Sequence, residues 1–296
     1  MNKLKLNSSE TTREKLLTQF NFETYLKYGT PQQIKNINID FLEWFIGFFE
    51  AEGSFSCWFD GKTNRVEIEI TQKDPQLMYK IRKNLGFGQV TQFLRNHKIY
   101  WRYKTSNEKY LKSFIYLFNG NLVSNYKKKM FEKFVSNYNK IYGTQFVVFN
   151  KNIVPSFETA WLSGFLEGNG GFYATSNNII KFNKSGFKTY NFIMKFYITQ
   201  KDELLLLNHI KKLFGMNNNI YQIHNGHTLD KYNRLETSKL SCHLLVIDYL
   251  EKYPFLGKRK ITFSRWKRLL NYKIYKYPIT NKSIIKLKRL ILSTKN

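Results

Sequence analysis

The same ten-residue pattern occurs twice in this chain, at positions 45–54 and again at positions 162–171. Each copy combines an apolar run, two small residues four positions apart and a Glu, and a Gly follows its last variable position. That last position is Glu52 in the first copy and Asn169 in the second. The repeat predicts a duplicated fold, and the exchange of an acid for an amide predicts that the two halves differ in chemistry.

A second repeat supports the duplication independently of the first. The pentapeptide Ile-Thr-Gln-Lys-Asp stands at 70–74 and recurs letter for letter at 198–202. The ten-residue pattern recurs after 117 positions, whereas the pentapeptide recurs after 128. The second half therefore has about eleven extra residues, and the polar stretch 177–188 is expected to hold them as an extended hairpin loop.

Local patterns predict the same order of elements in each half. An apolar helix at 40–52 or 158–169 stops at Gly, and strands with apolar–polar alternation follow. An amphipathic helix ending at Gly86 or Gly215, two more strands and a long basic helix complete the half. These last three elements are expected at 88–94, 99–105 and 122–142, and at 219–224, 233–240 and 257–275. The order αββαββα, present twice, predicts the α+β class.

The same patterns divide the chain into four segments. They are an N-terminal arm at 1–38, a first half at 39–142, a linker with Pro155 at 143–157, and a second half with a C-terminal tail at 158–296.

Composition indicates the kind of partner. The hydrophobic fraction of 42% is that of a folded protein, and the net charge of +27 favours polyanions such as nucleic acid. A membrane partner is disfavoured, because no run of about 18 uncharged apolar residues occurs. Cys57 and Cys242 are too few for a disulfide framework, and His224 and His227, in a Gly/Asn turn, do not form a zinc pattern.

Small residues four positions apart allow close packing of the two repeated helices. Gly47 with Ala51, and Gly164 with Gly168, would let their backbones approach, although two ordinary core helices are the alternative. If the helices pair in parallel about a pseudo-twofold axis, Glu52 and Asn169 come side by side. Carboxylates there would bind Mg²⁺, and an acid at a helix C-terminus is unfavourable without a cation.

These motifs resemble the double-motif LAGLIDADG homing endonucleases, over about residues 40–275. The resemblance implies the duplicated αββαββα fold with saddle-shaped antiparallel sheets, a long DNA target, and cleavage of both strands with Mg²⁺ or another divalent cation. It assigns the catalytic acid to Glu52 and matches Asn169 to the second acid, a departure. The metal site then comprises Glu52 and Asn169 with their preceding residues Ala51 and Gly168.

Further positions follow from the resemblance. Gln72 and Gln200 match residues that hold water around the metals, although a polar strand end is the alternative reading. Lys127 and Arg259 match the cation that stabilises the phosphate, although basic clusters are also general phosphate contacts. The earlier acids, Glu50 and Glu167, are expected only to pack or to solvate the helix end.

Alternation predicts which strand residues face a DNA duplex. Val66, Ile68 and Ile70 should pack inward, so the opposite parity should face out. A β-ribbon fits the major groove, and outward Glu67 and Glu69 favour base reading over charge attraction, with a solvated face as the alternative. The outward residues named in this way are Ser56, Trp58, Lys62, Arg65, Glu67, Glu69, Thr71, Arg102, Lys104, Tyr173, Thr175, Asn177, Asn191, Lys195, Tyr197, Thr199, Gln222, Arg234, Glu236 and Ser238.

The leading hypothesis is a monomeric, intron-encoded DNA endonuclease whose double-strand cutting is impaired, or reduced to nicking, by Asn169. The alternative is a maturase that binds its own intron RNA, and a third reading is that Asn169 was introduced to trap a complex. Alanine occurs only at 51, 160 and 174 while Lys, Asn and Ile abound, a bias typical of AT-rich organellar genes. A fungal mitochondrion is therefore the expected compartment, with the chloroplast as alternative.

Overall fold

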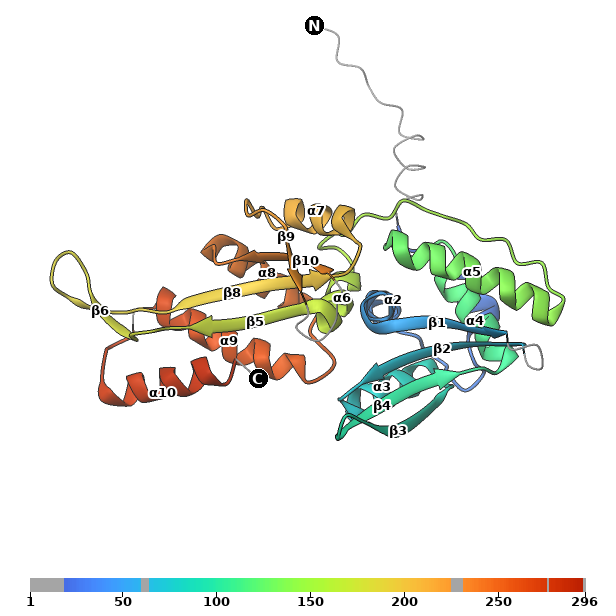
Figure 1. Cartoon of the computed structure of the whole chain (residues 1–296), viewed down its shortest axis with the longest axis horizontal. Coiled ribbons are helices and arrows are strands. Elements are labelled where there is room, and N and C mark those ends of the chain that lie inside the picture. Colours follow the sequence, from blue (N-terminus) through green and yellow to red (C-terminus); the bar gives the residue numbers. More distant parts are fainter. Residues whose placement is uncertain (1–18, 60–63, 225–230, 276, 295–296) are drawn as a thin grey trace, which may run out of the picture. The chain divides into compact units, whose positions relative to one another are not determined.

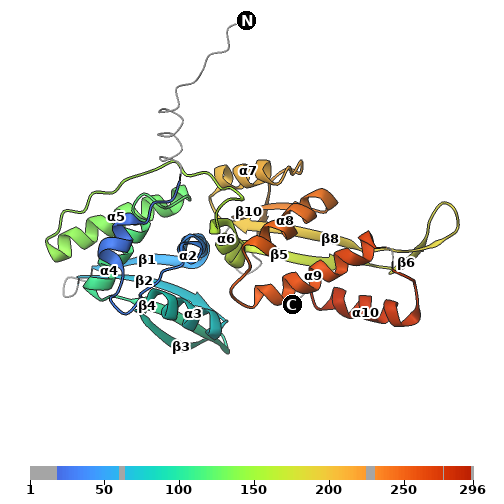
Figure 2. The ribbon, with the colours of Figure 1, turned by 180° about the vertical axis from the view of Figure 1, so that it is seen from behind.

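Two compact units make up the chain, Met1–Phe165 and Leu166–Asn296, and each carries a four-stranded antiparallel sheet (Figure 1). The computed structural model describes residues 19–59, 64–224, 231–275 and 277–294. The predicted α+β class and the duplication are confirmed, because helix, strand pair, helix and strand pair follow one another in both halves. Figure 2 shows the same elements from behind.

The first unit places its sheet in the order β1-β2-β4-β3. Asn38 caps its long apolar helix by accepting a hydrogen bond from the Phe41 backbone N–H at 3.3 Å, and the next helix ends at Gly86 in the left-handed conformation. The elements are η1 (Tyr25–Gly29), α2 (Ile39–Glu52), β1 (Gly53–Phe59), β2 (Asn64–Gln72), α3 (Pro75–Leu85), β3 (Gln89–Arg95), β4 (Lys98–Thr105), α4 (Glu108–Phe118) and α5 (Asn125–Tyr142).

The second unit repeats this sheet in the order β5-β8-β10-β9. A separate two-stranded hairpin, β6–β7, takes up the extra residues, as predicted for 177–188. The elements are α6 (Trp161–Asn169), whose first residues belong to the first unit, β5 (Gly170–Thr175), β6 (Ile180–Phe182), β7 (Lys188–Tyr190), β8 (Ile193–Gln200), α7 (Leu204–Leu213), β9 (Tyr221–His224), β10 (Lys231–Thr237), α8 (Leu240–Lys252), α9 (Arg259–Ile274) and α10 (Asn281–Leu292).

Several segments differ from the predicted order. Each half has one more helix than αββαββα before its long basic helix, α4 in the first half and α8 in the second. The last predicted strand, 233–240, is cut short at Thr237 because α8 begins at Leu240. Residues 19–38 are not simply a polar arm, since Phe22 and Tyr25 are buried.

Aromatic side chains fill both cores. In the first unit, Phe49 lies 4.6 Å from Phe118 and 4.9 Å from Phe55, measured between ring centroids. In the second, Phe172 of β5 lies 5.4 Å from Phe263 and 5.2 Å from Trp266, both on α9. Burial of each such ring contributes about 1.5–3 kcal/mol. The apolar face of each sheet is therefore the face that the helices cover.

Two glycines let α2 and the start of α6 touch backbone to backbone within the first unit. A Cβ atom on Gly47 would lie 1.9 Å from the Trp161 carbonyl oxygen, and one on Gly164 would lie 1.8 Å from the Trp44 carbonyl oxygen. Neither distance leaves room for a side chain. The predicted close approach is confirmed at these two positions. In the part of the chain that the structure describes, no helix is long and apolar enough to cross a membrane.

Candidate nucleic-acid interface and catalytic positions

The first acid of the motif, Glu50, joins three segments of the first unit. Its side chain is fully buried and accepts hydrogen bonds from the backbone N–H groups of Val123 and Ser124 at 2.8 and 2.7 Å. It also accepts one from the indole N–H of Trp161 at 2.6 Å. The expectation that Glu50 only packs or solvates the helix end understates its role, since it holds the chain that enters α5.

Glu167 makes the corresponding hydrogen bonds in the second unit. It is 5% exposed and accepts hydrogen bonds from the backbone N–H groups of Leu256 and Gly257, at 2.7 and 3.3 Å, just before α9. A carboxylate is stabilised by such donors ahead of a helix, where the macrodipole is positive. The first acid of each motif therefore fixes the start of the basic helix in its own half.

The cations predicted to face phosphate lie against the same motif ends. The Lys127 ammonium, on α5, donates to the carbonyl oxygen of Gly53 and is 9% exposed. Arg259, the first residue of α9, donates from all three nitrogens of its guanidinium. It donates to the carbonyl oxygens of Glu167 at 2.6 Å, of Gly168 at 3.0 Å, and of Gly170.

The last variable positions have different surroundings in the two units. Glu52 is half-buried at the end of α2, with Ala51 before it, and Gln72 ends β2 opposite Trp101. Asn169 donates a side-chain hydrogen bond to the amide oxygen of Gln200, which is 9% exposed. The structure therefore brings Asn169, Gln200, Gly168 and Arg259 together within the second unit.

A cavity of about 530 Å³ opens beside Asn169. Its walls combine motif residues with polar and aromatic side chains from three strands of the sheet. They are Gly168, Asn169, Gly170, Tyr197, Thr199, Ile223, His224, Tyr232 and Arg259. Because Tyr197 and Thr199 also belong to the predicted DNA face, the motif end and that face are continuous in the second unit.

On the first sheet, the register confirms which parity faces away from the core. Val66, Ile68 and Ile70 are buried, and the opposite face aligns charged and polar side chains across all four strands. Arg102 Nε lies 3.3 Å from Glu69 Oε2. The two opposite charges attract at this distance, but the pair does not have hydrogen-bond geometry. The residues in these cross-strand rows are Ser56, Trp58, Arg65, Glu67, Glu69, Thr71, Gln89, Thr91, Arg102 and Lys104.

Glu67 departs from the expectation of an outward base reader. It has the predicted parity but is only 3% exposed. Arg65 lies 2.6 Å from its carboxylate and Lys104 lies 3.9 Å away, and these two longer side chains cover it. Glu67 therefore orients two cations on the face instead of presenting its own oxygens to a ligand.

The polar face of the second sheet is also internally paired. Lys195 donates to Glu236, Arg234 donates to Thr199 Oγ1 at 3.1 Å, and the Arg234 guanidinium lies 4.0 Å from the Tyr197 ring centroid. The hydrogen bond to Glu236 raises the pKa of Lys195. Burial pushes the pKa of Glu236 upward, but hydrogen bonds from Lys195 and Tyr221 outweigh it, and the net shift is downward.

Other predicted DNA contacts in the second unit vary. Tyr173 and Thr175 share the polar face of β5. Asn177 and Asn191 lie in connecting segments, where Asn191 donates to the Asn178 carbonyl oxygen at 2.9 Å, and Ser238 follows the end of β10. Gln222 pairs with Asn233, so it lies on the parity of the core-facing Leu235, and its predicted facing is wrong. Lys62 and His227 lie outside the described residues.

Two tyrosines on the second face were missed by sequence reasoning. Tyr221 pairs with Arg234 and Tyr232 pairs with Ile223, so both have the outward parity. Sequence reasoning placed Gln222 outward, so it left Tyr221 on the other face of β9. The pairing of Tyr221 with Arg234 shows the reverse.

The sequence profile of the LAGLIDADG endonucleases matches residues 45–138 and 162–270 of this chain, which covers both motifs and both sheets. The chain belongs to the LAGLIDADG endonuclease family. Among curated proteins, it is similar to "Probable intron-encoded endonuclease 4" of Neurospora crassa, with 29% identity over 247 residues. That alignment covers 81% of this chain but 40% of the relative.

Solved LAGLIDADG structures share the fold. The meganuclease I-CpaMI, bound to uncleaved DNA, has a TM-score of 0.66 and 19% identity over 88% of this chain and 100% of that chain. The homing endonuclease I-LtrWI, bound to target DNA, has a TM-score of 0.63 and 19% identity over 86% and 97%. I-SmaMI, in the presence of calcium ions, has a TM-score of 0.60 and 18% identity over 88% and 100%.

The two motif ends of this LAGLIDADG chain differ in how well they suit a divalent cation. Hard cations prefer carboxylate and carbonyl oxygens, which Glu52 and Ala51 supply. In the second unit the side chain is a neutral amide whose N–H₂ donates to Gln200, and a guanidinium donates to the Gly168 carbonyl oxygen. A fixed positive charge beside that oxygen repels Mg²⁺, so these residues do not fit a metal. Among the described residues, no three His, Cys, Asp or Glu side chains form a cluster that could hold a metal.

Proposed function

We propose that this protein is a site-specific DNA endonuclease that binds a long duplex target and cuts mainly one strand. Family membership supports duplex cleavage in general, and three similar solved structures are DNA complexes. The observation that carries the strand preference is the contrast between Glu52 and the Asn169–Arg259 pair. The protein acts as a monomer, since both motifs stand in one chain.

Duplex reading is assigned to the polar faces of the two sheets. Cations, hydroxyls and aromatic rings occupy both, a mixture that contacts phosphates and base edges together. Arg65, Arg102 and Lys104 on the first sheet are paired with Glu67 or Glu69 before DNA arrives. Exchange of those partners for guanine acceptors makes binding selective, because a wrong base leaves a desolvated charge unpaired.

At the first motif, Glu52 and Ala51 would hold a divalent cation, and Gln72 would orient water near it. Such a cation would supply activation of water and stabilisation of charge on the scissile phosphate. Lys127 holds the Gly53 carbonyl oxygen and thereby fixes the turn that follows Glu52. At the second motif, Arg259 supplies a fixed positive charge, and Asn169 and Gln200 supply only neutral groups.

Strand-resolved cleavage tests this function. The target is selected from a random duplex library by binding to the purified protein, and its strands are then labelled with different dyes. With Mg²⁺ we expect one strand to be cut at least tenfold faster than the other, and EDTA to stop both. Glu52→Gln should abolish cutting but keep DNA affinity within threefold, while Glu132→Gln, an exposed change of the same charge, should cut normally. Equal rates on both strands would refute the impairment, and cutting by Glu52→Gln would refute the role of Glu52.

A splicing cofactor that binds intron RNA is the second candidate. It is favoured by Asn169, because loss of an acid impairs cutting but leaves the basic surface intact. Tighter binding to the host intron RNA than to any selected duplex would support it over cleavage. The fungal, intron-encoded relative supports an organellar gene, and we place the protein in the mitochondrion.

A further inference from the structure

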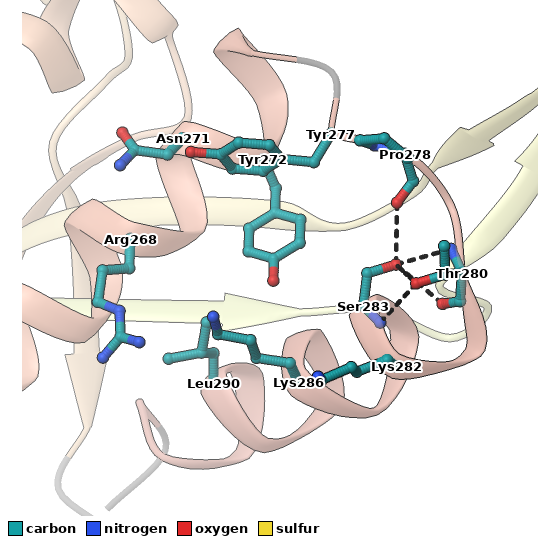
Figure 3. Close-up of a pocket in the computed structure, with 10 residues that line it drawn as sticks. All are labelled: Arg268, Asn271, Tyr272, Tyr277, Pro278, Thr280, Lys282, Ser283, Lys286 and Leu290. Atoms are coloured by element: carbon teal, nitrogen blue, oxygen red, sulfur yellow. Dashed lines mark hydrogen bonds between the residues drawn. The ribbon is translucent and has the colours of Figure 1, made fainter.

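A cleft on the helical side of the second unit combines cations with tyrosines. Two adjoining cavities, of about 470 and 680 Å³, share the wall made by Tyr272, Tyr277 and Pro278. We call them together the lysine–tyrosine cleft. Figure 3 shows the smaller cavity, where Tyr272 projects from α9 toward α10. Its charged lining residues are Arg268, Lys282 and Lys286, and those of the larger cavity are Lys181, Lys188 and Lys273.

The cleft lacks internal neutralisation. No acidic residue lines either cavity within the described part of the chain, and the sequence has no Asp or Glu after Glu251. Lys273 lies 5.0 Å above the Phe192 ring centroid. Local burial against that ring, and then the positive charge of Lys181, lower the pKa of Lys273, although the residue as a whole is exposed. Repelling cations held together in this way favour an external anion.

The aromatic wall is rigid. The Tyr190 hydroxyl lies 2.9 Å from the Pro278 carbonyl oxygen and 2.7 Å from Ser283 Oγ, which ties the β6–β7 hairpin to the start of α10. Tyr190 packs edge-on against Tyr272 with ring centroids 5.4 Å apart, and Tyr272 packs against Tyr277 at 5.1 Å. Tyr277 is 41% exposed, so part of its ring is open to a ligand.

The cleft shares only Asn191 with the residues predicted to face a duplex. Helices α9 and α10 lie along β5 (Figure 1). Phe172 of β5 packs against α9, and Tyr173 and Thr175 have the opposite strand parity. Helix α10 has no counterpart in the first half, because residues 143–160, between α5 and α6, form no helix. The cleft is therefore a feature of one half only, and the duplex-cutting function leaves it without a role.

The chemistry of the lining selects one kind of ligand. Cations on both sides of a tyrosine wall match several anionic groups instead of one, which is the pattern of a phosphodiester chain. Exposed rings between phosphate contacts are stacking platforms, and only unpaired bases can reach them. We infer that the lysine–tyrosine cleft binds single-stranded nucleic acid, independently of the duplex face.

Binding of fluorescent twelve-residue oligo(rU) and oligo(dT) to the full chain, at physiological salt, tests this inference. At least one of them should bind, and an excess of the selected duplex should not displace it. The stronger of the two identifies the source of the strand as RNA or DNA. Failure of both to bind, or full displacement by the duplex, would overturn the assignment.

Variants locate the site. The double variant Lys273→Ala/Lys286→Ala should weaken single-strand binding at least tenfold and duplex binding less than twofold. The matched control Lys184→Ala/Lys288→Ala removes the same charge from the neighbouring hairpin tip and from α10, outside the lining, and should change single-strand binding less than twofold. Tyr277→Ala should weaken it about fivefold or more through loss of stacking. Equal losses in the two double variants would mean that general charge, and not the cleft, attracts the strand.

Duplex binding and cleavage, measured on the same variants, separate this inference from the proposed function. If Lys273→Ala/Lys286→Ala still cuts duplex DNA but has lost the single strand, both assignments stand. If the wild-type chain binds the single strand but cuts no duplex, the cleft stands alone and the endonuclease proposal is wrong.

Discussion

The two halves of the chain share one framework and differ at the last variable position of the motif. In both, the first acid of the motif accepts hydrogen bonds from the backbone that enters the basic helix, through Glu50 or Glu167. After that shared anchor the halves diverge, because Glu52 and Lys127 in one half correspond to Asn169 and Arg259 in the other. The first acid of each motif is therefore a structural anchor, and the chemical role is proposed for the second acid, which only the first half carries.

The largest expected effect comes from removal of the shared anchor. Glu50→Ala leaves two backbone N–H groups and an indole N–H without their buried acceptor, which should cost about 4 kcal/mol of local stability. Amide hydrogen exchange in α5 should accelerate accordingly, and Glu167→Ala should have the same effect in α9. Glu132→Ala, on the exposed side of α5, is the control and should have little effect. A neutral result for either anchor would break the parallel between the halves.

The next largest effect should be that low pH destabilises the second half more than the first. His243 is 2% exposed and its Nε2 donates to the Thr237 carbonyl oxygen, 3.2 Å away, and burial lowers its pKa to about 4. The folded state then holds fewer protons than the unfolded state between pH 6.5 and 4, so the second half should lose about 3 kcal/mol of stability as pH falls through that window.

The first half shows which residue can replace His243 in a control variant. Leu111 stands six residues after Thr105, as His243 stands six residues after Thr237. His243→Leu should therefore make the second half as tolerant of acid as the first, when thermal unfolding is followed from pH 7 to pH 4. An unchanged pH profile in this variant would show that another group controls the acid response.

Giving the second motif the same acid and cation types as the first should increase the cleavage rate of the slowly cut strand. In the double variant Asn169→Asp/Arg259→Lys, the second motif has an acid and a single ammonium group, as the first half does. The guanidinium that donates to three carbonyl oxygens is removed. We expect about 100-fold faster cutting of that strand with Mg²⁺, equivalent to about 2.7 kcal/mol. Asn169→Asp alone should gain less, because Arg259 still opposes the metal. Equal gains would mean that the guanidinium does not matter.

The smallest effect is a loss of stability in the first half as the pH rises toward neutral. Burial, together with the negative charge of Asp40, raises the pKa of Glu43 to about 7, although the Ala160 backbone N–H opposes the shift. The folded state holds the extra proton, so stability falls as pH rises from 4.5 through 7, by about 1 kcal/mol after screening by water. Glu43→Gln should remove this slope in thermal unfolding between pH 5 and pH 8. A slope that persists would assign it elsewhere.

Much of the framework was readable from the sequence because it depends on local pattern. Alternation identified Val66, Ile68 and Ile70 as core residues, and the small residues predicted the contact at Gly47 and Gly164. Burial of Glu67 was not readable, because it depends on Arg65 and on Lys104 from a different strand. Helices α4 and α8 were missed because the sequence patterns after the second strand pair were read as one long basic helix in each half.

The site was predictable only in part. The motif named Glu52, Asn169 and Arg259, but sequence could not show that Arg259 would engage three carbonyl groups at the end of the motif. The facing of Gln222 was also beyond reach, since alternation separates two faces of a strand without saying which one the helices cover.

The crossing of α2 and α6 at Gly47 and Gly164 affects how relatives of this chain are recognised. Because neither position tolerates even a methyl group, selection for a folded protein preserves the motif whether or not the protein still cuts DNA. A genome search with this motif therefore finds chains that share the fold. Whether such a chain is an active nuclease depends on the last variable position of the motif, where the second copy here has Asn169.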